Sequence, residues 1–157
     1  ERRIERLVNP QLSGLPAFLV SNSGLNSGFM IAQYTAASLV SENKVLSHPA
    51  CVDSIPTSAN KEDHVPMSVI SARKCREIVK NTTYVIAIEF LCAAQAMDLF
   101  TNLKPGEGTL AAYRIIRSAI PHLEGDRVLG TDIETMTQLI KSGTITAAVE
   151  KAVGKLL

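Results

Sequence analysis

The chain has 157 residues, of which 46% are hydrophobic and 20% charged, and its formal net charge is +1. A chain of this length is one domain with room for its own core, and so small a net charge gives no electrostatic reason to expect a nucleic acid or an anionic membrane surface as a partner. Aromatic residues make up only 4%, whereas Ala, Ile, Leu and Val are plentiful, a balance that favours close-packed helices over a β-sandwich.

The first residues have the pattern of a helix that has already begun. Ile4, Leu7 and Val8 stand at helical spacing, and neither a Met nor a capping residue precedes them. We therefore expect the tail of a longer helix and a chain that is a fragment. Pro10 breaks the pattern, and the segment 11–23 is predicted to be an irregular loop of a length that often carries function.

A long helix is predicted over about residues 28–46. Asn26 or Ser27 can cap it by accepting a backbone N–H bond. Residues 29–40 are apolar or small on nearly every face, which is typical of a helix buried on all sides. Pro49 follows the end of the pattern.

A second, longer helix is predicted over about residues 67–103. At 1.5 Å per residue it would be a rod about 55 Å long. Between Tyr84 and Met97 its only strongly polar residues are Glu89 and Gln95. A rod of this length cannot hide such a surface within one small domain, so we expect an oligomer core, or further parts of the same chain, to cover it.

The rest of the chain also has helical periodicity. Thr131 and Glu134 have the spacing of a capping box, and no strand pattern occurs anywhere in the sequence. The predicted fold class is all-α, a bundle of long helices formed by residues 1–157 as a single helical segment. The shorter helices are predicted over about residues 109–120, 131–142 and 144–153.

No membrane partner and no metal site are expected. Polar residues interrupt each apolar run before it reaches the length that spans a membrane. The three cysteines, Cys51, Cys75 and Cys92, are odd in number and lack metal-ligand spacing. We interpret them as free thiols that pack in the core of a protein of the reducing cytoplasm.

Between the two long helices lies a polar turn, residues 54–67, punctuated by prolines. Lys61, Glu62, Asp63 and His64 follow one another within it, so four ionisable groups of both signs are adjacent. Loops held by rigid helices are frequent places for binding and catalysis. This turn is therefore the first candidate for a functional site.

Residue types alone leave three interpretations of the turn open. Asn60 can cap the following helix, with acidic residues in the first turn where the helix dipole favours them. A metal site has weak support, because His48 and His122 are not at i+4 spacing from His64. The third interpretation is a catalytic carboxylate, which the crowding of charges and the position between loop and helix both favour.

Further motifs follow one another in a fixed order and cover most of the chain. They are Gly24–Gln33, Ser41–Lys44, His48-Pro49, Val52–Asn60, Glu62–Val65, Leu91–Ala96 and Asp98-Leu99. The series resembles the histidine ammonia-lyases, within the superfamily of aromatic amino acid ammonia-lyases. An ordered match of this extent, at nearly constant register, is highly specific.

The resemblance implies that the chain is the C-terminal third of such an enzyme. Members are homotetramers of long, nearly parallel helices, with each active site built from several subunits. They eliminate ammonia from an α-amino acid with a methylidene-imidazolone electrophile that forms from an internal Ala-Ser-Gly. That tripeptide occurs nowhere in residues 1–157, and neither do the family's tyrosine base loop and its Tyr/Arg segment. We therefore expect the chain alone to be inactive.

The resemblance also implies roles for three residues. Glu62 stands where the histidine enzymes have an active-site glutamate and the phenylalanine and tyrosine enzymes usually have Gln. A carboxylate can accept the N–H of a substrate imidazole or offset its positive charge, and it can transfer a proton during elimination. Met30 and Ser58 stand where plant phenylalanine enzymes carry Lys and Glu, which favours histidine as substrate; packing and turn formation are their alternative roles.

Some neighbours of Glu62 match the residues that are usual in this family, and others differ from them. Asp63 and His64 are assigned to structure, as hydrogen-bonding groups that orient Glu62. Lys61 stands in place of the more usual Gln and Pro66 in place of the more usual Ser. Lys61 can pair with Glu62 and lower its pKa, or point to solvent.

The sequence thus predicts an all-α segment of an enzyme that converts L-histidine to urocanate and ammonia in the cytoplasm. Glu62 is the predicted catalytic residue, and Glu62, Met30 and Ser58 are the predicted substrate contacts. Two alternatives stay open. One is an ammonia-lyase for tyrosine or phenylalanine, and the other is a non-catalytic helical assembly module whose turn is merely structural.

Overall fold

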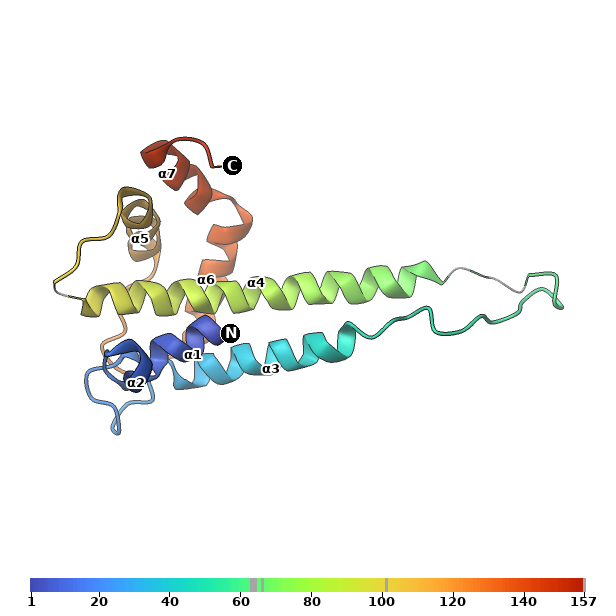
Figure 1. Ribbon diagram of the computed structural model, residues 1–157, viewed down its shortest axis with the longest axis horizontal. Helices are drawn as coiled ribbons and strands as arrows, with labels where there is room; N and C mark the ends of the chain where they lie inside the picture. The colour runs from blue at the N-terminus through green and yellow to red at the C-terminus, as the bar shows by residue number, and fades with distance from the viewer. Residues whose placement is uncertain (63–64, 66, 101, 157) are drawn as a thin grey trace.

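The computed structural model describes residues 1–62, 65, 67–100 and 102–156, and the regular structure of this part is helical (Figure 1). No strand occurs among the described residues, although two isolated β-bridges, Ser23–Asn26 and Thr57–Glu62, close turns. The predicted all-α fold class is confirmed. The elements are α1 (Arg2–Val8), α2 (Pro10–Ser13), the 3₁₀ helix η1 (Ala17–Leu19), α3 (Met30–Leu46), α4 (Ser68–Leu99), α5 (Glu107–Ala119), α6 (Leu129–Lys141) and α7 (Thr144–Val153).

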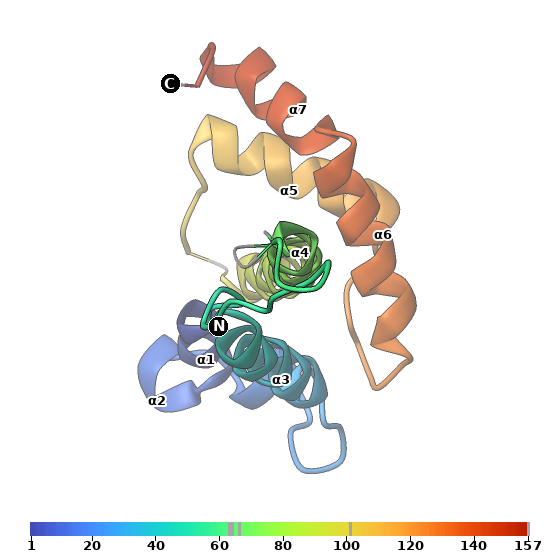
Figure 2. The same cartoon turned by 90° about the vertical axis from the view of Figure 1, so that its right-hand side faces the viewer.

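Helix α4 is the axis of the molecule. Its 32 residues extend over about 48 Å at 1.5 Å per residue. α3 runs beside it, α1 lies close to both, and α5 and α6 pack on it from the other side, with α7 on α5 (Figures 1 and 2). In the view along its axis, α4 has α1 and α3 below it, α5 above it and α6 to its right (Figure 2).

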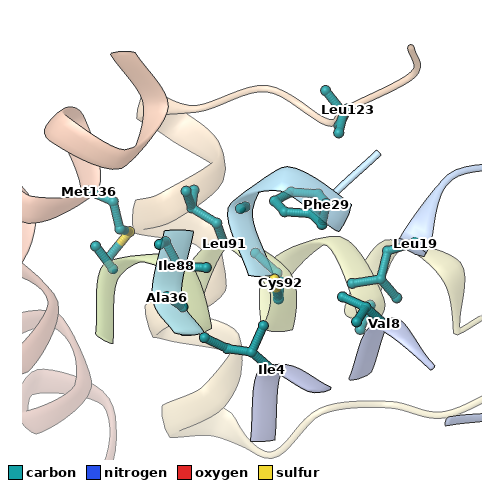
Figure 3. Close-up of a cluster of buried hydrophobic side chains, with 14 of the residues drawn as sticks. Ile4, Val8, Leu19, Phe29, Ala36, Ile88, Leu91, Cys92, Leu123 and Met136 are labelled. Carbon is teal, nitrogen blue, oxygen red and sulfur yellow. The ribbon is translucent and has the colours of Figure 1, made fainter. Parts of the chain in front are cut away.

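The hydrophobic core forms where the shorter helices meet α4 (Figure 3). Several of the buried residues of α3 and α4 are alanines, and such small side chains allow helix backbones to approach closely. The core lies toward the C-terminal half of α4, because its buried residues begin at Asn81. The labelled core side chains are Ile4, Val8, Leu19, Phe29, Ala36, Ile88, Leu91, Cys92, Leu123 and Met136.

The observed helix boundaries differ from the predicted ranges by a few residues. α3 begins at Met30 and α4 ends at Leu99, inside the ranges expected from the sequence, whereas α5 and α6 begin before theirs. The predicted capping box is wrong, since Thr131 lies within α6, whose N-cap Val128 makes no side-chain bond. The segment 11–23, predicted to be irregular, includes most of α2 and all of η1.

Helix α3 is not buried on all sides, as its apolar composition had indicated. Its buried residues are Ala32 and Ala36, whereas Ile31 is 60% exposed and Tyr34 is 70% exposed. The prediction is wrong for the single chain because α3 packs mainly on α4 along one side, with α1 at one end. Large apolar surfaces of this kind are typical of protein–protein interfaces.

The prediction that no apolar run reaches membrane-spanning length also needs correction. By length and composition α4 passes that test, with a mean hydropathy of 1.2. Core helices of soluble proteins pass it as well. α4 packs against α1, α3, α5 and α6, and its Glu89 forms an ion pair with Arg3. These contacts are those of a core helix.

The cysteines divide between core and surface. All three are free thiols, but only Cys92 is packed in the core, where burial raises the pKa of its thiol. This thiol therefore stays protonated and unreactive. Cys51 and Cys75 are exposed, so the prediction of core packing is wrong for both of them.

A partly buried carboxylate joins the end of α4 to α5. Arg117 Nη2 donates to Asp98 Oδ2 at 2.6 Å, and His122 Nδ1 lies 2.6 Å from the same oxygen. Tyr113 OH donates to Oδ1 at 2.5 Å. The side chains of Asp98 and Arg117 are only 14% and 15% exposed. An ion pair in such a site is stabilising only because hydrogen bonds satisfy both partners.

Next to this cluster, the amide of Gln95 ties three segments together. Its Nε2 donates to Leu19 O at 3.0 Å and to Leu123 O at 2.9 Å, and its Oε1 accepts from Leu123 N at 3.1 Å. Gln95 is almost fully buried, so these bonds are costly to lose. They fix η1 and the α5–α6 connection on α4.

Substitution of Asp98 by Asn tests this junction. We expect the free energy of unfolding to fall by about 3 kcal/mol, because Arg117 would keep its charge in a largely buried site without a counter-charge. Tyr113→Phe removes one donor but leaves the ion pair, and should cost about 1 kcal/mol. Denaturant unfolding followed by circular dichroism measures both losses. Equal losses in the two variants would contradict this role of the ion pair.

The same carboxyl makes stability depend on pH. Burial acts to raise the pKa of Asp98, but its hydrogen bonds and the charge of Arg117 outweigh burial and hold the pKa below its ordinary value of 3.8. A lowered pKa in the folded state gives stability that is present above the unfolded-state pKa and is lost as pH falls through the folded-state pKa.

We therefore expect the stability difference between the unaltered chain and Asp98→Asn to be constant from about pH 7 to pH 5 and to shrink below about pH 4. Urea midpoints measured across this range test the expectation. A difference that stays unchanged down to about pH 2 would contradict it.

Candidate active site

The connection between α3 and α4 folds back on itself at residues 57–62. Thr57 N donates to Glu62 O at 2.7 Å, and Glu62 N donates to Thr57 O at 3.3 Å. Between them Ser58, Ala59 and Asn60 have φ angles of 55°, 52° and 69°. Left-handed backbone costs about 1–2 kcal/mol for each such residue, and strain of this kind is concentrated at functional sites.

The carboxylate of Glu62 is held within this turn. Its Oε2 accepts from Thr57 Oγ1 at 3.1 Å and from Ser58 Oγ at 3.5 Å. The Glu62 side chain is exposed, and in the described part of the chain no donor reaches Oε1. That oxygen can accept an N–H from a bound molecule. Two of the predicted site residues, Ser58 and Glu62, thus lie together.

Glu62 does not cap the following helix. α4 begins only at Ser68, with Met67 as N-cap and no acidic residue in its first turn. Asn60, predicted to be the N-cap of a capping box, lies inside the left-handed turn, so this prediction is wrong. The capping interpretation of the acidic residue at position 62 is thereby excluded.

Other predicted neighbours contribute less to the geometry. Lys61 is exposed and, among the residues that the structure describes, forms no ion pair with Glu62. Its alternative role, pointing to solvent, is the observed one. The predicted roles of Asp63, His64 and Pro66 lie outside the described residues.

Met30 lies far from the turn. It is the first residue of α3, at the end of that helix next to α2, and its side chain is half-buried. From Met30 α3 runs about 24 Å to Leu46, and the segment that contains Glu62 extends beyond that end (Figure 1). The structure therefore does not bring Met30 together with Glu62 and Ser58 in one chain. A site with all three residues needs more than one copy.

The start of α3 is held by Asp126, which the sequence analysis missed. Ser27 N donates to Asp126 Oδ2 at 2.9 Å, Gly28 N donates to Oδ1 at 2.8 Å, and Asp126 N donates to Asn26 Oδ1 at 3.2 Å. The predicted caps Asn26 and Ser27 are therefore wrong: the N-cap is Phe29, and it makes no side-chain bond. No local pattern could reveal a contact between residues so distant in sequence.

A close backbone approach fixes the same segment from the other side. Phe29 N donates to Phe18 O at 3.0 Å. Gly28 has a φ of +53°, and a Cβ at this position would lie 2.5 Å from Phe18 O. Phe18 and Leu19 themselves have positive φ angles, 56° and 57°. Only glycine fits at position 28 without moving this backbone.

A cavity of about 670 Å³ lies between the two arms of the α3–α4 connection. Among the described residues that line it, Asp53 is the only acidic one, and Glu62 is not one of them. No group of three or more possible metal ligands occurs among the described residues. The chemistry-bearing groups are thus those of the turn. Residues 50–55 line one side of the cavity. The other side is lined by the residues around the start of α4, which are Val65, Met67, Ser68, Ile70 and Ser71.

Comparison with known proteins adds independent information. The family model for aromatic amino acid lyases matches residues 1–118. Histidine ammonia-lyase of Alkaliphilus oremlandii is 63% identical over 153 residues, which are 98% of this chain and 30% of that protein. The crystal structure of histidine ammonia-lyase from Trypanosoma cruzi has a TM-score of 0.92 and 55% identity, covering 97% of this chain and 30% of that one.

A more distant relative has the same fold. The crystal structure of a tyrosine aminomutase from Streptomyces globisporus has a TM-score of 0.92 at 37% identity, and covers 99% of this chain and 30% of that one. The geometry of α1–α7 is thus similar in proteins whose names give different reactions. The chain spans about 30% of the length of the relatives it matches.

Alanine at position 28 tests the close approach to Phe18. Gly24→Ala is a matched control, because Gly24 also has a positive φ, +106°, but a Cβ there would meet nothing within 4 Å. We expect Gly28→Ala to lower the free energy of unfolding by about 2 kcal/mol more than Gly24→Ala does, owing to overpacking against backbone. Denaturant unfolding measures the difference, and equal losses would argue against the clash.

Proposed function

The chain belongs to the aromatic amino acid lyase family, and we propose that it forms part of a histidine ammonia-lyase, which eliminates ammonia from L-histidine to give urocanate. The observation that carries the proposal is the exposed carboxylate of Glu62 on a strained turn. Its support comes from relatives named histidine ammonia-lyase, among them one that is 63% identical. The chain works, on this proposal, as the C-terminal part of a longer cytoplasmic enzyme.

In this function Glu62 binds the substrate imidazole. No donor of the described chain forms a hydrogen bond with its Oε1. This oxygen can therefore accept the ring N–H, or offset the charge of an imidazolium. The hydroxyl groups of Thr57 and Ser58 hold Oε2 and restrict the rotamers of the carboxylate. A carboxylate positioned in this way can also take up or return a proton during elimination.

The second substrate contact is Met30, which would pack its thioether chain against the imidazole ring. Because Met30 and the Glu62 turn lie at opposite ends of α3, different copies of the chain must supply them. We propose a homotetramer in which the exposed apolar faces of α3 and α4 are covered by other subunits. The exposed Ile31 and Tyr34 of α3 and Val79 of α4 support this arrangement.

The electrophile has to come from elsewhere in the longer enzyme. The family's methylidene-imidazolone forms from Ala-Ser-Gly, and no such tripeptide exists in this sequence, so the residues present here cannot form it. When present, the group would activate the substrate for loss of ammonia. The described residues contribute substrate binding and the assembly of the subunits, and the chain alone should be inactive.

A second candidate function is an ammonia-lyase that acts on tyrosine or phenylalanine. The fold shared with a tyrosine aminomutase favours it, whereas the carboxylate at position 62 favours histidine. The loop that would separate these specificities in the family is not part of the chain. A non-catalytic assembly module is the remaining alternative, and it predicts no turnover of any of these amino acids.

Glu62→Gln in the full-length enzyme that carries this chain tests the proposal. The amide keeps the size of the side chain but loses its charge, so we expect kcat/KM for L-histidine to fall by about 100-fold or more. Glu107→Gln, which neutralises an exposed carboxylate in the first turn of α5, is the matched control. Urocanate absorbance gives the rate.

The outcomes separate the alternatives. Similar urocanate rates in the unaltered enzyme and Glu62→Gln would remove Glu62 from the site. Production of coumarate or cinnamate from tyrosine or phenylalanine, without urocanate from histidine, would assign the second candidate function. Absence of all three products from a folded tetramer would leave the assembly module.

A further inference from the structure

The connection between α5 and α6 braces the start of α3. Asp126 lies in this connection, and its two carboxylate oxygens accept from two successive backbone amides, Ser27 N at 2.9 Å and Gly28 N at 2.8 Å. Its own N–H returns a bond of 3.2 Å to Asn26 Oδ1. The side chain of Asp126 thus binds two backbone N–H groups just before α3, nearly a hundred residues earlier in the chain.

We propose that Asp126 is a positioning residue for substrate binding, which acts through Ser27 and Gly28 on Met30. The inference rests on the proposed function, because it takes Met30 as a substrate contact. It concerns a residue beyond the 1–118 segment that the family model matches. Asp126 itself touches backbone and has no direct part in the chemistry.

The chemistry of the contact requires a carboxylate. α3 has neither a side-chain cap nor an acidic residue in its first turn, so its positive end lacks a local counterpart. Asp126 provides two acceptors, one for each amide. An asparagine has one oxygen and one NH₂ group, and the NH₂ would face a backbone N–H. Asp126→Asn therefore keeps the size and breaks one of the two bonds.

The amides that Asp126 binds, those of Ser27 and Gly28, lie only two and three residues before Met30. Met30 N donates to Ser27 O at 3.1 Å, and Phe29 N donates to Phe18 O at 3.0 Å. Gly28 lies between these bonds, closely packed against Phe18 O. A shift of Ser27 therefore moves the first residue of α3, because no flexible linker absorbs it.

The connection that carries Asp126 is itself held in place by several hydrogen bonds. The guanidinium of Arg127 donates to Pro121 O at 2.8 Å, to His122 O at 2.8 Å and to Asp132 Oδ2 at 2.9 Å. Leu123, in the same connection, is bound at both backbone groups to Gln95 of α4. A carboxylate on such a support can hold a substrate contact to the precision that binding needs.

The test uses the full-length enzyme and compares two substitutions in the same connection. Asp126→Asn should raise KM for L-histidine by about tenfold and change kcat by less than about threefold, because ground-state and transition-state binding are weakened alike. Glu124→Gln neutralises an exposed carboxylate of this connection but leaves the bonds from Asp126 to Ser27 and Gly28 in place. It should leave KM unchanged.

A double-mutant cycle identifies the route of the effect. In a Met30→Ala background, Asp126→Asn should raise KM by less than about twofold, because the side chain that it positions is gone. If Asp126→Asn does not assemble, Asn26→Ala, which keeps the carboxylate and removes only the returned bond, should still raise KM by about threefold.

Three results would overturn the proposal. They are an unchanged KM in the Asp126→Asn enzyme, an unchanged KM in Asn26→Ala where Asp126→Asn fails to assemble, and an equal rise of KM with and without Met30. Lack of urocanate production by the unaltered enzyme would overturn both this proposal and the proposed function. An active unaltered enzyme with unresponsive variants would overturn this proposal alone.

Discussion

The length of α4 is the constraint on which the rest of the structure depends. A helix of 32 residues is about 48 Å long, and the helices that pack on it cover mainly its C-terminal half, where its buried residues lie. α3 follows it on one side and leaves Ile31 and Tyr34 exposed. The connection to α4 therefore projects beyond the core, and the turn with Glu62 is carried there (Figure 1). Packing thus leaves the Glu62 turn outside the core of the single chain, where the proposed function needs it to meet another subunit.

At the C-terminal half of α4, where the other helices pack, polar groups determine how these helices are arranged. Asp98, Gln95 and Asp126 each accept or donate hydrogen bonds across segments that are distant in sequence. Gln95 and Asp98 are largely buried, and buried polar groups are costly unless they are fully satisfied. Asp126 is exposed, but its two bonds to backbone amides are directional. Together these groups favour one register between the C-terminal helices and the start of α3. The hydrophobic contacts around Ile88 and Leu91 supply stability, but they discriminate less between neighbouring registers.

Helical periodicity and capping signals predicted the fold class and the long helices α3 and α4 to within a few residues. They failed at the caps, because Asn60 and Thr131 have suitable side chains but α4 and α6 begin at Ser68 and Leu129, without side-chain caps. The sequence also singled out Glu62 and Ser58, which do lie together. It could not place Met30 relative to them, nor reveal Asp126, since both depend on contacts between distant segments.

Under the proposed function, different copies of the chain supply Met30 and Glu62 to one site. Complementation tests it directly: Met30→Arg and Glu62→Gln enzymes, each inactive alone, are unfolded, mixed and refolded together. If the residues come from different subunits, random mixing restores both native residues at about a quarter of the sites, and urocanate production returns to about that fraction. If both come from the same subunit, no site regains both residues, and a mixture no more active than its parents would contradict the account.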